Sequence, residues 1–197
     1  EVIQFRSAQL IAANTYRLSG LLRGRCGTED QTGVHATGDR FVLLTTTATD
    51  RLSVPSTDIG TAALYRFGPA ILPIENALYS EKTFTATGRA LKPWSVVNIS
   101  GTRAGADLTI TWTRRSRNNY GWLDSVDVPL GETSEMYEVD IMNGQTVVRT
   151  IRVTSPTASY TAAQQTADFG STQGSVSVII YQLNDSIGRG IPSAATI

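Results

Sequence analysis

The sequence Leu108-Thr109-Ile110-Thr111-Trp112-Thr113 alternates large apolar side chains with threonines. Because successive residues of a β-strand point to opposite faces of the sheet, this period of two predicts a strand with one apolar and one hydroxyl face. Tyr137-Glu138-Val139-Asp140-Ile141 repeats the alternation, and the run from Val147 to Val153 continues it. The long apolar segment from Ser175 to Leu183 predicts a further strand.

Turn residues separate these runs. Asn143-Gly144 stands between two alternating runs, and this pair is favoured in the tight turn of a β-hairpin. Further turn candidates are Asn118-Asn119, Pro129-Leu130-Gly131, Ser155-Pro156 and Gly170. Short strands at this spacing, over about a hundred residues, predict a β-sandwich.

The first half of the chain also alternates, but less regularly. Runs bounded by turn residues predict strands at Val2–Phe5, Thr15–Leu18, Arg40–Leu44, Ala62–Phe67 and Lys82–Ala86. A short connector then leads into Lys92-Pro93-Trp94, so we place a domain boundary at about residue 91. The sequence thus predicts an all-β fold, with a small antiparallel β domain at residues 1–91 and a sandwich at residues 92–197.

Charge and composition disfavour several classes of partner. The 197 residues include 17 basic and 17 acidic side chains, so the net charge of zero gives no long-range attraction to nucleic acid or an anionic membrane. The apolar stretches are far shorter than the roughly 20 residues that cross a bilayer. Because the sequence starts at Glu1 without a leader pattern, we expect a piece of a longer polypeptide, whose other parts are candidate partners.

Catalytic and metal-binding interpretations find little support. Cys26 and His35 are the only residues of their kinds, and a thiolate nucleophile would need an imidazole close by. A predicted turn separates Cys26 from His35, so their spacing indicates no catalytic geometry. We expect the Cys26 side chain to be buried as a small hydrophobic residue, and His35 to lie in a loop and form a hydrogen bond with the backbone. A structural zinc site would need four ligands of these kinds. We expect no catalytic residue, no metal and no cofactor.

Acidic residues gather at Glu132, Glu135, Glu138 and Asp140, which allows a calcium or glycosidase interpretation. Glu138 and Asp140 would share one face of a strand. No Asp-rich calcium loop accompanies them, so a polar, solvated sheet face is the preferred interpretation.

Basic and aromatic residues gather in the segment after the Trp112 run, at Arg114, Arg115, Arg117, Tyr120 and Trp122. Such side chains hold glycans or acidic partners by stacking and bidentate hydrogen bonds, so this segment is the best surface-binding candidate. In the alternative that we favour, Asp124 and Asp127 neutralise the arginines and Trp122 packs on the edge of the sandwich.

Residues 92–197 resemble a fibronectin type III domain. Pro93-Trp94 precedes the first strand, residues 108–112 resemble the second strand with its core tryptophan, and residues 137–141 resemble the third. Residues 176–193 resemble the last two strands and the turn between them. The resemblance implies a sandwich whose end loops are free to bind.

The resemblance has one departure. Val176 stands where the family usually places a tyrosine that forms the corner of the penultimate strand. The corner hydrogen bond is then either missing or supplied by Tyr160 or Tyr181.

The first half of the chain is similar to the large tail-hub proteins of phages and gene transfer agents. The similarity rests on residues 1–5, 16–25, 27–29, His35 and 38–44. In that family the stretch follows a TIM-barrel-like region, and fibronectin-like domains decorate a symmetric ring or trimer at the distal end of the tail. The resemblance implies a virion protein of the tail tip or baseplate, assembled in the bacterial cytoplasm.

Together these features predict a structural protein, not an enzyme, that contributes to hub assembly and to host-surface attachment. Its expected partners are other tail-tip proteins, the remaining domains of its own chain, further copies of itself and a cell-surface glycan. No direct nucleic-acid or membrane-spanning role is expected. The alternative is a carbohydrate-binding module of a larger cell-surface or hydrolytic protein, with Arg117, Tyr120 and Trp122 as an exposed platform.

Overall fold

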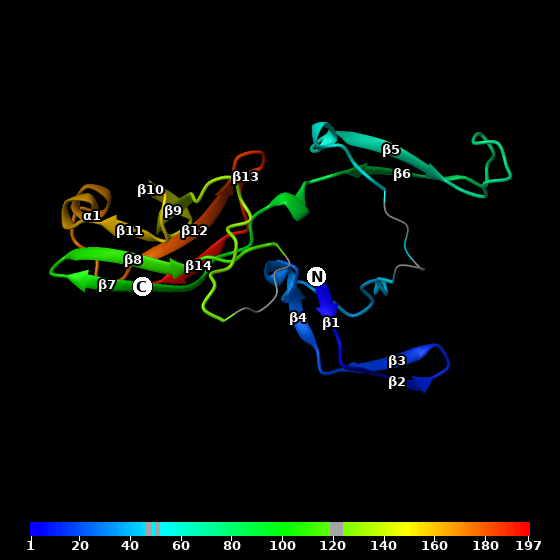
Figure 1. Cartoon of the computed structure of the whole chain (residues 1–197), viewed down its shortest axis with the longest axis horizontal. Helices are drawn as coiled ribbons and strands as arrows, with labels where there is room; N and C mark the ends of the chain where they lie inside the picture. Colours follow the sequence, from blue (N-terminus) through cyan, green and yellow to red (C-terminus); the bar gives the residue numbers. More distant parts are fainter. Residues whose placement is uncertain (46–48, 50–51, 119–123) are drawn as a thin grey trace. The chain divides into compact units, whose positions relative to one another are not determined.

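A computed structural model describes residues 1–45, 49, 52–118 and 124–197. Its elements are mainly β-strands, and within these ranges the paired strands run antiparallel (Figure 1). The predicted all-β fold class is therefore confirmed. In the part of the chain that is described, no helix has the length and apolar character needed to span a membrane.

Residues 92–197 form two antiparallel sheets. The first has the strand order β11-β8-β7, with β7 (Val97–Ala104), β8 (Asp107–Thr113) and β11 (Thr157–Tyr160). The second has the order β10-β9-β12, with β13 and β14 on the other edge of β12. Its strands are β9 (Tyr137–Asn143), β10 (Thr146–Val153), β12 (Ser177–Asn184), β13 (Gly188–Arg189) and β14 (Ser193–Thr196).

The chain changes sheets between β8 and β9, between β10 and β11, and between β11 and β12. Such crossings produce the strand arrangement of immunoglobulin-like and fibronectin type III-like sandwiches. The predicted sandwich is therefore confirmed, including the hairpin at Asn143-Gly144, where Gly144 has a φ of 60°.

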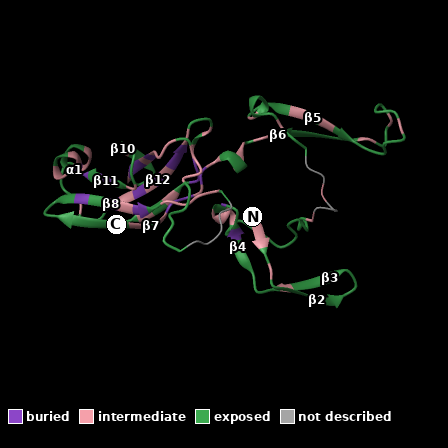
Figure 2. Cartoon of the chain, in the orientation of Figure 1, coloured by how far each residue is buried: buried purple, intermediate pink, exposed green. Residues whose placement is uncertain are grey.

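The core of the sandwich lies between the two sheets, where the buried residues of Figure 2 gather. Along β8, the buried apolar residues alternate with threonines that are exposed or half-buried. The buried side chains include Leu108, Ile110 and Trp112 of β8, Tyr137, Val139 and Ile141 of β9, and Val178 and Ile180 of β12. Burial of each large apolar side chain stabilises the fold by about 1.5–3 kcal/mol, so residues 92–197 contain a core of their own.

Helix α1 (Ala162–Phe169) connects β11 to β12 and was not predicted. Its start is fixed by a capping box, in which the Thr161 hydroxyl accepts from the N–H of Gln164 and the Gln164 carboxamide accepts from the N–H of Thr161. Gly170 ends the helix in the left-handed conformation, with a φ of 79°. Gln165 is completely buried and donates to two backbone carbonyls, which anchors the helix on the sandwich.

Side chains around α1 form a hydrogen-bonded cluster. The Tyr160 hydroxyl donates to Asp168 Oδ2 at 2.8 Å, and Arg149 donates to both Asp168 oxygens at 2.7 and 2.8 Å. The hydrogen bond from Arg149 lowers the pKa of Asp168, and burial raises that of Tyr160. The Tyr160 hydroxyl thus bonds a side chain of α1, whereas the corner tyrosine of the family bonds the backbone, and Tyr181 stacks against a guanidinium group.

The first half of the chain forms separate two-stranded sheets. Strand β1 (Val2–Gln4) pairs with β4 (Leu22–Arg25), and β2 (Ser7–Ala12) pairs with β3 (Thr15–Ser19). A third sheet pairs β5 (Ala62–Phe67) with β6 (Ser80–Thr85). Single turns of 3-10 helix lie at Glu29–Gln31, Ser56–Asp58 and Arg89–Leu91.

The strand predicted at Arg40–Leu44 was wrong, because these residues are in neither a strand nor a helix. The run from Phe41 to Leu44 is apolar at each position and does not alternate. Each of its four side chains is more than half exposed, and the described residues provide no strand beside it. An apolar run without a partner strand does not satisfy its backbone hydrogen bonds as a sheet.

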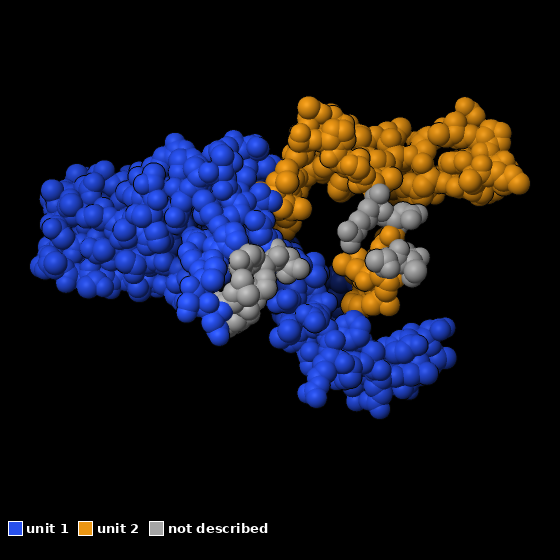
Figure 3. All heavy atoms as spheres, viewed as in Figure 1, with its two compact units in different colours: residues 1–39, 92–197 blue, residues 40–91 orange. Residues whose placement is uncertain are grey.

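The chain divides into two compact units (Figure 3). One contains residues 1–39 and 92–197, and the other contains residues 40–91. The second unit ends at residue 91, which is also where the sequence predicts the domain boundary. Residues 1–39 cluster with the sandwich, and the division into domains at 1–91 and 92–197 stays a prediction.

Candidate functional site

The predicted surface-binding residues are in part bonded within the chain. Arg114 Nη2 donates to Asp127 Oδ2 at 2.5 Å and to the carbonyl of Val128 at 2.7 Å. Arg117 Nε donates to Glu132 Oε1 at 2.7 Å. The neutralisation expected from Asp127 is thus present at Arg114.

Arg115 connects the sandwich to the N-terminal segment of the same unit. Its Nη2 donates to Glu29 Oε1 at 2.5 Å, and its guanidinium carbon lies 5.1 Å from the centre of the Trp94 ring. Trp94 also packs on Gly27, where a Cβ atom would come within 2.3 Å of the indole ring. Arg115 therefore has a structural role, because it links the sandwich to the N-terminal segment.

The remaining two residues of the cluster, Tyr120 and Trp122, fall within residues 119–123, which lie outside the described residues. An anionic ligand at this segment would have to compete with the carboxylates that the arginines already contact. The surface-binding role of Arg114, Arg115, Arg117, Tyr120 and Trp122 therefore stays a prediction.

The acidic residues on β9 are enclosed by an arginine, contrary to the solvated face that we expected. Arg189 donates to Glu138 at 2.7 Å and to both oxygens of Asp140 at 2.6 and 2.9 Å, so Glu138 and Asp140 do share a face. Asp140 is buried, and the Thr150 hydroxyl donates to it at 2.6 Å. A buried carboxylate needs such partners, which explains why the face is covered rather than hydrated. Among the described residues, no group of three or more acidic, histidine or cysteine side chains is placed to hold a metal ion.

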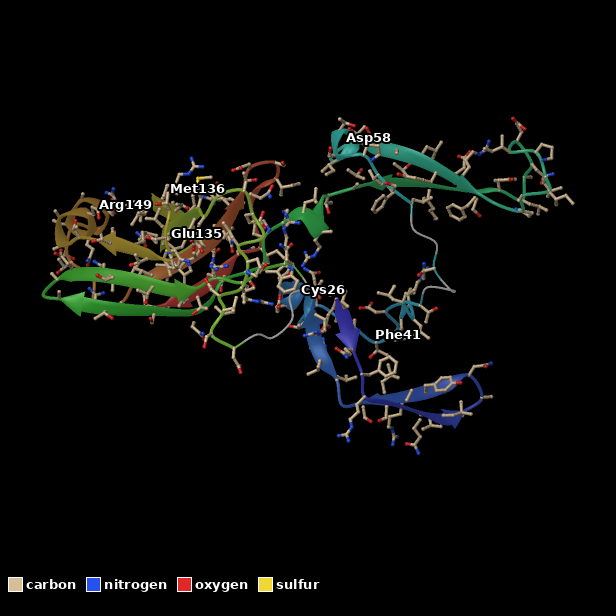
Figure 4. The ribbon with its side chains drawn as sticks, viewed as in Figure 1. Cys26, Phe41, Asp58, Glu135, Met136 and Arg149 are labelled. Atoms are coloured by element: carbon tan, nitrogen blue, oxygen red, sulfur yellow. The ribbon has the colours of Figure 1, made fainter. Side chains whose placement is uncertain are left out.

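Cys26 and His35 take places different from those expected. Cys26, labelled in Figure 4, is exposed and has a left-handed φ of 58°, so it is not the buried hydrophobe that we expected. His35 contacts carboxylates, with its Nε2 at 3.0 Å from Glu1 Oε2 and its Nδ1 at 3.6 Å from Asp39 Oδ2.

Glu1 is the centre of a polar cluster in the N-terminal segment. Arg23 donates to its carboxylate at 2.5–2.8 Å, and the backbone N–H of Gly24 donates to Oε1 at 2.7 Å. These hydrogen bonds, that from Arg23 first, lower the pKa of Glu1 from about 4.5 to about 2. The cluster holds residues of the β1–β4 sheet together.

The feature that sequence reasoning missed is an apolar face on the β5–β6 hairpin. Tyr65 pairs across the sheet with Lys82, and Ala63 pairs with Phe84, so these side chains share one face. The opposite face carries the ion pair between Arg66 and Glu81, at 2.7 Å. The hairpin is therefore amphipathic.

This face contains a groove of about 300 Å³, lined by Leu52, Val54, Tyr65, Phe67, Lys82 and Phe84. Its apolar lining is open to solvent, since Leu52 is 73% exposed and Phe84 58%. Tyr65 and Phe84 contact each other edge to face, with ring centres 6.3 Å apart. The alternation in residues 63–67 predicts such a face, but only the structure shows that the described residues of its unit form no second sheet over it.

The β2–β3 hairpin has the same character. Leu10 and Tyr16 pair across it and are 60% and 61% exposed. Both hairpins are mostly exposed in Figure 2, in contrast to the central sandwich strands β8, β9 and β12. Two-stranded sheets of this kind are only marginally stable in water, so their apolar side chains are suited to contact another surface.

The strand order places the chain among all-β proteins with a fibronectin type III-like sandwich. Residues 1–42 match the model of the family described as Rcc01698-like, C-terminal. These residues include most of those that carry the resemblance to tail-hub proteins. No curated protein matches the chain.

Several solved structures are similar to the chain at low identity. The rat CD45 extracellular region, domains d3–d4, is 11% identical with a TM-score of 0.38, and the match covers 97% of this chain and 93% of that one. The FN5 domain of Drosophila Lar is 13% identical with a TM-score of 0.32, covering 53% and 94%. The Clostridium perfringens spore cortex lytic enzyme SleM is 7% identical with a TM-score of 0.34, covering 68% and 38%.

Proposed function

We propose that this chain is a structural component of the tail tip or baseplate of a phage or gene transfer agent. In this role it contributes to assembly of the hub and presents sandwich loops to the host surface. The proposal assigns no bond-making step to the chain. It is supported by the family match over residues 1–42, which overlaps the similarity to tail-hub proteins.

The single observation that carries the proposal is the contrast between a closed sandwich and open hairpins. The sandwich buries its apolar residues internally, whereas the large apolar side chains of β2, β3, β5 and β6 are mostly exposed. Monomeric soluble proteins rarely expose extended apolar patches, and such patches mark contact surfaces. A role in assembly explains why the hairpins retain these side chains.

The partners in this proposal are proteins. Other tail-tip proteins, the remaining domains of the same polypeptide and further copies of the chain, as in a trimer, would cover the hairpins. The balanced charge of 17 basic and 17 acidic residues does not favour contact with the DNA that passes through a tail. The chain would be assembled in the bacterial cytoplasm and would reside in the virion.

An electron-microscopy reconstruction of the particle that carries this chain tests the proposal. We expect density for the chain in a symmetric tail-tip assembly, with the β2–β3 and β5–β6 hairpins against neighbouring protein and residues 114–122 facing outward. Absence of the chain from any particle, together with glycan binding by an isolated monomer, would instead favour a carbohydrate-binding module.

A further inference from the structure

The groove on the β5–β6 hairpin contains one charged residue, Lys82, among its apolar lining. The described chain shows no ion pair for Lys82. By contrast, ion pairs are made by Arg23, Arg66, Arg114, Arg115, Arg117, Arg149 and Arg189. Lys82 is therefore an available cation within an otherwise apolar surface.

We propose that this groove binds an extended segment of a neighbouring polypeptide, which places a carboxylate on Lys82 between two apolar side chains. The inference rests on the proposed function for the presence of a partner, and it specifies the chemistry of that partner. It concerns only residues of the 40–91 unit.

Charge is the main argument for this partner. A surface that covers Phe67 and Phe84 also removes water from Lys82, which pairs across the sheet with Tyr65 on the same face. Burial of an ammonium group without a counter-charge is costly, whereas burial beside a carboxylate with good geometry is tolerated. A partner that covers the groove must therefore supply an anion at this position.

The shape of the surface favours an extended segment. β5 and β6 pair only with each other within the described residues, so each has an edge with free backbone groups. A peptide that adds to such an edge gains main-chain hydrogen bonds, and its alternate side chains point to the same face. An acidic residue flanked two positions away by apolar residues would match Lys82 between the aromatic side chains of the groove.

The test uses the full chain and two short peptides that alternate valine with threonine and differ only in a central glutamate or lysine. Binding is followed by the NMR shifts of the amides in β5 and β6. We expect the glutamate peptide to bind at least about tenfold more tightly, which corresponds to about 1.4 kcal/mol. In Lys82→Glu this preference should reverse.

The chain contains a single other lysine, Lys92, which lies outside the groove and provides the matched control. Lys92→Glu makes the same change in net charge and should keep the preference for the glutamate peptide. Equal affinity for the two peptides, absence of binding, or the same effect of both substitutions would overturn the inference. The proposed function is judged separately: if Phe84→Ser removes the chain from particles but the peptides are not distinguished, only the inference fails.

Discussion

The sandwich and the β5–β6 hairpin are built on the same alternation of side chains, but only the sandwich has a core. Ile110 and Ile180 are completely buried, whereas Phe67 and Phe84 are 52% and 58% exposed. The difference is the presence of a second sheet opposite the apolar face. An alternating pattern therefore fixes which side chains share a face, and the surrounding chain decides whether that face becomes a core or a contact surface.

The largest expected effect is a difference in the free energy of unfolding between substitutions in the sandwich core and on the β5–β6 hairpin. Ile180→Ala removes a fully buried side chain from the sandwich and should lower its free energy of unfolding by about 2–5 kcal/mol. Leu64→Ala, at a site 61% exposed on β5, should change the sandwich transition by less than about 0.5 kcal/mol. Urea denaturation of the full chain measures both values, and similar losses would contradict the contrast.

The hydrogen bonds around α1 provide a second test of the closed region. Tyr160→Phe leaves the charged Asp168 without one donor and should lower the free energy of unfolding by about 1.5–3 kcal/mol. Tyr181→Phe is the matched control, because the described structure shows no hydrogen bond from its hydroxyl. Calorimetric unfolding should show a loss for Tyr160→Phe alone, and an equal loss in both variants would show that the Tyr160–Asp168 hydrogen bond does not contribute as proposed.

The contact between Gly27 and Trp94 tests whether the N-terminal segment shares the stability of the sandwich. Gly27→Ala adds a Cβ atom that meets the indole ring at a residue with a φ of 73°, and we expect a cost of about 1–3 kcal/mol. Gly144→Ala has a similar φ of 60° but open space around the new atom. Hydrogen exchange in β4 should increase only in Gly27→Ala. No difference between the two variants would indicate that the Trp94 contact is unimportant.

The smallest effect concerns pH at the N-terminal cluster. Since the pKa of Glu1 is lowered to about 2, its carboxylate stabilises the fold above the unfolded value near 4.5, and this contribution is lost as the pH falls toward 2. Glu1→Gln should therefore speed exchange of the Gly24 amide at neutral pH and match the parent near pH 2. Glu81→Gln, in the exposed pair with Arg66, should leave that amide unchanged. A difference that does not depend on pH would contradict this account.

Regular alternation predicted four strands of the sandwich, β8, β9, β10 and β12, but not β7, β11, β13 or β14. Strands β8, β9 and β12 and the turn at Asn143-Gly144 are found close to their predicted positions, because a half-buried strand leaves a clear pattern in sequence. The prediction of a strand at Arg40–Leu44 was wrong because it relied on apolar content without alternation. Helix α1 was missed because its eight residues depend on a cap and on the buried Gln165 rather than on an apolar stripe.

The candidate sites were harder to predict for a different reason. The partner of Arg115 is Glu29, 86 positions earlier in the chain, and no local pattern connects them. The pairing of Arg189 with Asp140 is likewise long-range. For the β5–β6 groove, the alternation of Ala63, Tyr65 and Phe67 was visible in the sequence, but its exposure depends on tertiary structure, since the described residues of its unit form no second sheet over it. Sequence patterns report local geometry, and these sites depend on tertiary contacts.

Hydrogen–deuterium exchange of β5 and β6, compared between the purified chain and the complete particle, tests the central claim most directly. Amides of a two-stranded sheet with an uncovered apolar face should exchange rapidly in the purified chain, while those of β9 and β12 should be protected in both states. Incorporation into the particle should protect β5 and β6 strongly. Unchanged rapid exchange of these strands in the particle would show that the hairpin is not a contact surface and would contradict the account.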